Sequence, residues 1–271
     1  MKPTRRFYYS LLLTTLMLVA ACTTVAVTGR RQVNLIPSST MLSMSSGEYR
    51  NFLSQAKLST NREQTEMVKR CGARIQAQVE AYFRENGMAD RLNDFAWEFN
   101  LVDSPEVNAW CMPGGKVVFY TGILPITKDE EGLAVVMGHE IAHAIAEHGS
   151  ERMSQGLLTN LGGMAIAQAL KDKPQQTQQL FMAAFGLGAQ FGLLLPFSRL
   201  HESEADKLGL IFMAKAGYNP ESAVAFWERM REMKGGQAPP EFMSTHPSDE
   251  TRIRDLKAQM PEALRVYKPR Q

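Results

Sequence analysis

The chain has 271 residues, of which 44% are hydrophobic and 21% are charged, with 13 Pro and 20 Gly. This composition is typical of a globular protein with one large domain or two small ones, and it excludes collagen-like, disordered and polytopic membrane proteins. The net charge of +2 gives no reason to expect a nucleic acid as partner, and three Cys are too few for a disulfide-stabilised scaffold.

Residues 1–21 resemble the signal peptide of a bacterial lipoprotein. Lys2, Arg5 and Arg6 form a cationic start, an apolar run follows, and small residues stand directly before Cys22. We expect cleavage before Cys22 and lipidation of this residue, which would attach the protein to a membrane of the bacterial cell envelope, facing the periplasm. A plain secretory signal or a short membrane anchor is the alternative. Without residues 1–21, which contain three cations and no acids, the net charge is −1.

The next segment, 22–46, contains Thr, Ser, Gly and Pro with little periodicity. We expect it to form a lipid-anchored tether, followed by one folded domain over 47–265. Within that domain a helix is expected from Thr60 or Asn61 to Asn86, because apolar residues recur there at three- and four-residue spacing.

Three short extended runs follow this helix. Apolar and polar residues alternate over 95–102, which predicts a half-buried strand. Residues 107–112 and 116–121 flank Pro113-Gly114-Gly115, a turn sequence. Together the three runs predict a small antiparallel sheet.

A second helix is expected to begin at Thr127, which has the spacing of a capping box to Glu130. Apolar residues continue as far as Ile145, and Gly149 marks the expected end. Because nearly all intervening positions are apolar, we expect this helix to be buried.

The rest of the chain is predicted to be helical. Residues 157–170 and 181–195 are apolar, but each is shorter than the roughly twenty residues that a membrane-spanning helix needs. We expect a hairpin of buried or amphipathic helices there, with a membrane contact as the alternative. Asn219-Pro220 and Pro247-Ser248 predict the starts of two further helices.

The motif that carries chemistry is Gly138-His139-Glu140-Ile141-Ala142-His143. A helix turns once in 3.6 residues, so His139 and His143 lie on one face, close enough to share a metal ion, with Glu140 beside them. Two solvated histidines are the alternative, which the apolar surroundings disfavour because buried imidazoles need partners. This pattern predicts a zinc site.

A catalytic zinc ion has three protein ligands and an open position, so a third ligand must come from elsewhere. Glu202 and Glu204 are the candidates, and on a helix they point in directions about 200° apart. Glu202 shares a face with Asp206, one turn later. We therefore expect Glu202 to bind the metal and Asp206 to hydrogen-bond the second ring nitrogen of a ligand histidine.

These motifs resemble the zinc metallopeptidases related to the CAAX prenyl protease, HtpX and the mitochondrial stress protease, with bacterial lipoprotein and periplasmic members as the nearest type. The resemblance covers about residues 60–260. The matching segments are His139-Glu140-x-x-His143, Ser198-Arg199-x-x-Glu202-x-x-Ala205-Asp206, Asn108-Ala109 with Pro113-Gly114-Gly115, and Thr245-His246-Pro247 with Arg252.

The resemblance implies an α+β, mostly helical zincin-type (gluzincin) domain with a small sheet beside the motif helix, and Zn²⁺ as cofactor. It also implies an endopeptidase in which Glu140 takes the proton of a zinc-activated water. Asn108 and Ala109 match the edge strand to which an extended substrate adds. The expected substrates are unfolded or misassembled cell-envelope proteins. The alternative is a lipid-anchored chaperone or binding module with a structural zinc site, although such sites usually include Cys and have four protein ligands.

Two further residues are assigned catalytic roles through the resemblance alone. His246 and Arg252 are expected to face the cleft, where they would stabilise the oxyanion or hold the substrate carbonyl. His246 could instead be a fourth zinc ligand that keeps the enzyme latent, or a loop histidine without a role.

Overall fold

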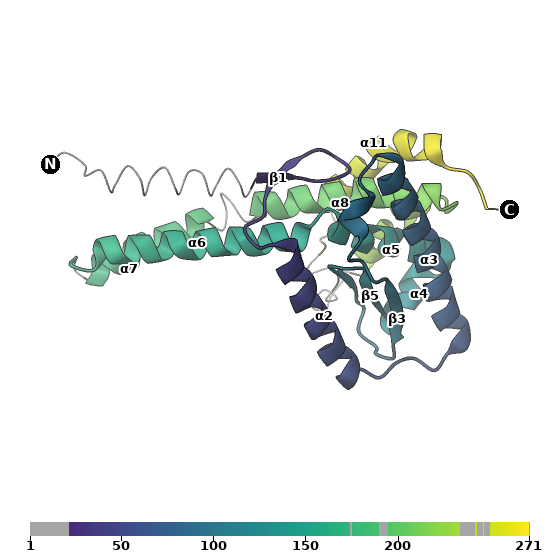
Figure 1. Cartoon of the computed structure of the whole chain (residues 1–271), viewed down its shortest axis with the longest axis horizontal. Helices are drawn as coiled ribbons and strands as arrows, with labels where there is room; N and C mark the ends of the chain where they lie inside the picture. The colour runs from purple at the N-terminus through teal and green to yellow at the C-terminus, as the bar shows by residue number, and fades with distance from the viewer. Residues whose placement is uncertain are drawn as a thin grey trace. The chain divides into compact units, whose positions relative to one another are not determined.

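The computed structural model describes residues 22–173, 175–189, 195–233, 242, 246 and 250–270. The chain forms two compact units, one from residues 1–41 and 147–197 and the other from residues 42–146 and 198–271. Helices dominate both, and two small sheets accompany them (Figure 1). The predicted α+β, mostly helical fold class is confirmed.

The first unit combines a β-hairpin with a helical hairpin. Strand β1 pairs antiparallel with β2, and helices α6 and α7 lie side by side (Figure 1). No described helix is both long and apolar enough to cross a membrane. The elements are β1 (Cys22–Thr24), β2 (Arg31–Val33), the first residues of α2 (Ser38–Gln55), α6 (His148–Leu170) and α7 (Gln175–Ala189).

The predicted tether over 22–46 is structured, which corrects the expectation of an irregular segment. Arg30 forms an ion pair of 2.7 Å with the buried carboxylate of Glu151 on α6, and the backbone N–H of Leu35 donates to the Ser154 hydroxyl. These partners lie more than a hundred residues away, so the local lack of periodicity could not reveal them. The expected boundary at residue 46 falls inside α2.

The second unit contains the other helices and the larger sheet. Its elements are α3 (Arg62–Glu85), η1 (Ala89–Leu92), β3 (Glu98–Val102), β4 (Ala109–Met112), β5 (Lys116–Tyr120), η2 (Thr121–Ile123), α4 (Leu124–Thr127), α5 (Glu130–Ile145), most of α8 (Leu195–Lys215), α9 (Ser222–Glu232) and α11 (Glu250–Val266).

The three-stranded sheet has the order β3-β5-β4, with β5 in the centre. Strand β4 pairs antiparallel with β5 across the expected turn, in which Gly114 and Gly115 have positive φ angles of 86° and 78°. Strand β3 runs parallel to β5. The sheet is therefore mixed and not purely antiparallel, because the hairpin folds back so that its second strand, not its first, lies next to β3.

Helix α5 packs against α3 and contacts β4, and its ends differ from the expected ones. Asp129, not Thr127, caps the N-terminus, because its side chain accepts a hydrogen bond from the backbone N–H of Gly132. The helix ends at Ile145, before the left-handed Glu147 (φ 59°), and Gly149 already belongs to α6. A charged carboxylate at this cap also interacts favourably with the helix dipole.

Candidate metal centre

The His-Glu-x-x-His motif lies on α5, where every residue from Gly132 to Ile145 is buried. The side chains of His139 and His143 are one helical turn apart, and their Nε2 atoms lie 3.1 Å from each other. Glu140 is 3% exposed. The structure therefore excludes a pair of solvated histidines on this helix.

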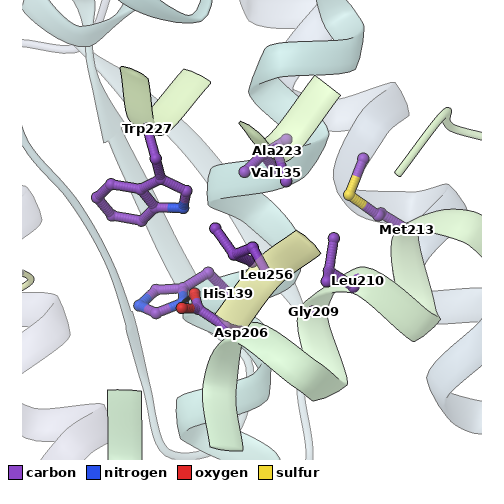
Figure 2. Close-up of a pocket in the computed structure, with 9 residues that line it drawn as sticks. All are labelled: Val135, His139, Asp206, Gly209, Leu210, Met213, Ala223, Trp227 and Leu256. Carbon is purple, nitrogen blue, oxygen red and sulfur yellow. Dashed lines mark hydrogen bonds and ion pairs between the residues drawn. The ribbon is translucent and has the colours of Figure 1, made fainter. Parts of the chain in front are cut away.

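Helix α8 places two carboxylates against the motif. Glu202 is close to both histidines, with Oε2 3.4 Å from Nε2 of His139 and Oε1 3.3 Å from Nε2 of His143. One turn later, Asp206 accepts a hydrogen bond of 2.9 Å from Nδ1 of His139 (Figure 2). With Nδ1 donating to this carboxylate, Nε2 of His139 is directed at the cluster, as in a metal-binding histidine.

The two helices approach closely because a glycine on each lacks a side chain. A Cβ atom on Gly138 would lie 2.8 Å from the carbonyl oxygen of Gly209, and a Cβ on Gly209 would lie 2.9 Å from the backbone of Gly138. Gly138 directly precedes His139, and Gly209 follows Asp206 by three residues. The distance between the imidazoles and the carboxylates therefore depends on this contact.

His246 completes a group of four potential ligands. One donor atom from each of His139, His143, Glu202 and His246 lies within 4.8 Å of the others. Nδ1 of His246 is 2.9 Å from Oε2 of Glu202 and 3.0 Å from Nε2 of His139. Four ligands around one zinc ion lie roughly 3.3 Å apart, so both the donor types and their spacing fit Zn²⁺.

The charges in the cluster are strongly coupled. Burial and the charge of Arg252 lower the pKa of His139, but Asp206 and Glu202 outweigh them and raise this pKa to about 9. Burial opposes ionisation of Glu202, yet hydrogen bonds from the three imidazoles hold its pKa well below the ordinary range. The cluster therefore favours a positive charge between these carboxylates, as a metal ion would supply.

Glu140 has the opposite tendency. Burial raises the pKa of its carboxyl above the ordinary value, and this effect exceeds the opposing charges of His246 and His139. Its Oε1 lies 3.5 Å from Nε2 of His246. A buried carboxylate with a raised pKa beside a metal site is suited to accept a proton.

Arg252 lies beside two carboxylates of the site. Its guanidinium donates to Oε2 of Glu202 (3.2 Å) and to Oδ1 of Asp206 (2.6 Å), and its carbon lies 3.4 Å from the centroid of the Trp227 ring. The residue is 7% exposed. Two carboxylates and an indole ring thus hold the guanidinium beside Glu202 and Asp206. The contact of Arg252 with the substrate carbonyl stays a prediction.

The predicted substrate strand lies at an edge of the larger sheet. Ala109 begins β4, which in the described part of the chain pairs with β5 alone. Asn108 precedes the strand, and its side-chain oxygen accepts from the backbone N–H of Ala109. β4 also contacts α5, so this edge lies near the motif helix.

Sequence reasoning missed two features of the site. No sequence pattern indicated that the ring of Trp227 contacts both Arg252 and His139, with a centroid distance of 6.0 Å to the imidazole. The contact between Gly138 and Gly209 was missed as well. An isolated glycine within an apolar helix is a signal of close backbone approach, and it could have indicated this contact.

Two helices that bring an imidazole pair, a carboxylate and a buried glutamate together define the class of the metallopeptidases with a His-Glu-x-x-His helix. The model of peptidase family M48 matches residues 70–260. The chain belongs to this family, which confirms the resemblance at the level of the family.

Curated relatives carry names of metalloendopeptidases. The chain is 40% identical to mitochondrial metalloendopeptidase OMA1 of Schizosaccharomyces pombe over 64% of its length and 49% of the relative. It is 30% identical to metalloendopeptidase OMA1 of Homo sapiens, in a match that covers 89% of the chain and 46% of the relative. It is also 28% identical to the β-barrel assembly-enhancing protease of Escherichia coli, in a match that covers 59% of the chain and 34% of the relative. The chain thus spans about half or less of the length of these relatives.

These relatives correct the predicted location. The proteins that are 30–40% identical to the chain are named as mitochondrial enzymes, whereas the Escherichia coli protein is less similar. The bacterial cell envelope is therefore the wrong location by this comparison. The predicted signal peptide over residues 1–21 lies outside the described residues, and the predicted lipidation of Cys22 has no support from the relatives.

Proposed function

We propose that the chain is a zinc-dependent endopeptidase. The observation that carries this proposal is the convergence of His139, His143 and Glu202 on one point, with the buried Glu140 beside it. Family membership and the names of the relatives support the same reaction class.

In this proposal His139, His143 and Glu202 hold the zinc ion. When bound, zinc supplies Lewis acidity and lowers the pKa of a water molecule towards about 7. Glu140 accepts the proton of the attacking water and passes it to the leaving amine of the substrate. Its burial raises its pKa, which makes it a better proton acceptor than an exposed carboxylate.

Asp206 and Arg252 act as positioning residues. Asp206 holds the ring of His139, and Arg252 joins Asp206 to Glu202 through one guanidinium. Because a guanidinium is planar and rigid, it fixes the distance between the two carboxylates. The stacking of Trp227 on Arg252 holds this guanidinium in place.

His246 has the role of a latch in this proposal. Its Nδ1 lies as close to Glu202 and His139 as a fourth metal ligand would. Its backbone N–H donates to the carbonyl of Phe242, and the two rings are 4.7 Å apart. A substrate would have to displace the imidazole before its carbonyl could approach the metal.

Polypeptides in an extended conformation are the proposed substrates. Among the described residues β4 pairs with β5 alone. An edge strand of this kind offers main-chain hydrogen bonds, which recognise an extended chain with little dependence on its side chains. We therefore propose unfolded or misassembled proteins as substrates, with Asn108 and Ala109 at the edge that receives them.

A specific observation also favours a second function. Four protein ligands around one metal are typical of a structural site, and His246 supplies a fourth donor. The chain would then be a binding or chaperone module with a closed metal site.

Incubating the purified chain with an unfolded protein separates the two functions. Cleavage that a chelator abolishes and that added zinc restores supports the endopeptidase. A zinc-loaded chain that binds the unfolded protein without cleaving it would support the binding module and overturn the endopeptidase.

A further inference from the structure

The helical hairpin of α6 and α7 carries an apolar surface that nothing in the described residues covers. Among the side chains described between residues 156 and 185, none is buried. Five of the exposed large hydrophobic residues lie on this hairpin: Met153 (40% exposed), Leu157 (44%), Leu161 (58%), Met164 (69%) and Phe181 (54%).

The exposed residues of α6 form a stripe. Met153, Leu157, Leu161 and Met164 follow one another at spacings of four, four and three residues, so they share one face of the helix within about 80°. The stripe spans roughly 17 Å along the helix at 1.5 Å per residue.

The stripe is not the surface by which the hairpin holds itself together. The two helices contact each other through Gly162 and Gly163, where an added Cβ would meet the ring of Phe185 at 3.1 and 3.4 Å. This contact uses the small residues of α6 and leaves the four side chains of the stripe exposed.

The charged residues of the hairpin lie near the start of α6, at Glu151 and Arg152, and at the turn between the two helices. From Met153 to Leu170 and from Gln175 to Ala189 the sequence has no Asp, Glu, Lys or Arg. Lys171, Asp172 and Lys173 lie at the turn, and all three are exposed. A helix face in water normally carries charges, so two long uncharged stretches joined by a turn of net charge +1 require a different explanation.

We propose that this hairpin binds the surface of a lipid bilayer that contains anionic lipids. The stripe of α6 and the ring of Phe181 lie at the boundary between headgroups and acyl chains, and Lys171 and Lys173 contact lipid phosphates. Over its described residues neither helix is long and apolar enough to span the bilayer, and we therefore place the hairpin in the interface.

A lipid surface fits these residues better than a second copy of the chain. Protein interfaces depend on aromatic and Arg side chains in the centre and on polar groups that fix the register of the partner. The hairpin offers one exposed aromatic ring, flexible Leu and Met side chains, and neutral Gln, Ser, Thr and Asn between them. A bilayer binds without polar groups that fix one alignment, and anionic headgroups complement the charges of the two lysines.

Flotation of the full-length protein with vesicles tests this proposal. The vesicles consist of phosphatidylcholine alone or of phosphatidylcholine mixed with phosphatidylglycerol. The variant Leu161→Gln/Met164→Gln/Phe181→Gln is expected to bind the mixed vesicles about tenfold or more weakly than the unchanged chain, because three apolar side chains leave the interface.

A matched control is the variant Met44→Gln/Leu58→Gln, whose side chains are exposed to 48% and 45% but lie outside the hairpin. It is expected to bind like the unchanged chain. Every variant keeps residues 1–22, so any contribution of this segment is the same in all of them.

The variant Lys171→Gln/Lys173→Gln tests the two lysines of the turn. It is expected to lose most of the preference for phosphatidylglycerol, on the order of fivefold per lysine, and to keep its binding to phosphatidylcholine.

Equal flotation of the hairpin variant and the control would overturn the proposal, as would an unchanged chain that binds no vesicles. A measurement of molar mass in solution tests whether a second copy of the chain binds this surface instead. A dimer that the hairpin substitutions convert to a monomer, without any change in flotation, would assign the stripe to a second copy and overturn the lipid surface.

Discussion

The guanidinium carbon of Arg252 lies over the ring of Trp227, 3.4 Å from the ring centroid, while its nitrogens donate to Glu202 and Asp206. The indole face attracts the cation, and the carboxylates fix its orientation. Neither residue is adjacent in sequence to the motif on α5, yet together they support a proposed metal ligand and the partner of His139.

Arg252→Lys is expected to weaken zinc binding by about 10- to 100-fold, because an ammonium group cannot bond both carboxylates in the plane that a guanidinium does. Competition with a metal-binding dye measures this change. Arg254→Lys is the matched control, since the side chain of Arg254 is 73% exposed. Zinc affinity that is the same in both variants would contradict the positioning role of Arg252.

Gly138→Ala is expected to destabilise the protein, although alanine in a helix is usually more favourable than glycine. The new methyl group would meet the carbonyl of Gly209 at 2.8 Å, and such overpacking costs about 1–3 kcal/mol. Gly149→Ala is the control, because a Cβ there meets nothing within 4 Å. Thermal unfolding compares the two variants, and equal melting temperatures would show that the helices separate without cost.

The three proposed ligands and the partner of His139 could be predicted from the sequence. The period of a helix places His139 and His143 on one face of their helix, and Glu202 and Asp206 on one face of another. The supporting residues could not be predicted in this way. The stacking of Trp227 on Arg252 depends on how α9 and α11 pack, which no local pattern encodes. The parallel pairing of β3 with β5 and the contacts of Arg30 with Glu151 also join residues that are distant in sequence.

Glu130 at the start of α5 predicts a pH dependence of stability. Burial raises the pKa of its carboxyl, but hydrogen bonds from Arg70 and Tyr218 outweigh this effect and lower it below the ordinary value. A lowered pKa in the folded state means that the carboxylate stabilises the protein at neutral pH, and that this contribution is lost as the pH falls below about 4.

Glu130→Gln is therefore expected to lower the melting temperature at pH 7 and to have a diminishing effect towards acidic pH. Glu85→Gln, at the exposed end of α3, is expected to change neither the melting temperature at pH 7 nor its dependence on pH. A difference between Glu130→Gln and the unchanged chain that stays constant with pH would show that the charge of this carboxylate contributes nothing.

His246→Ala is expected to raise kcat for an unfolded protein substrate, because it removes the imidazole that covers the proposed metal position. Zinc affinity should fall in the same variant, since one of four donors is lost. Steady-state kinetics at saturating zinc measures the effect. A loss of kcat on the order of a hundredfold would instead support stabilisation of the oxyanion, and an unchanged kcat and KM would leave His246 without a role.

The central claim, that this site hydrolyses peptide bonds with Glu140 as the base, is tested by comparing the unchanged chain with Glu140→Gln. The amide has nearly the same shape as the carboxylate but cannot accept the proton of the attacking water. The variant is expected to keep its zinc, measured by elemental analysis, and its melting temperature, but no longer to cleave an unfolded protein. Cleavage at the unchanged rate by a zinc-loaded Glu140→Gln variant would contradict the central claim.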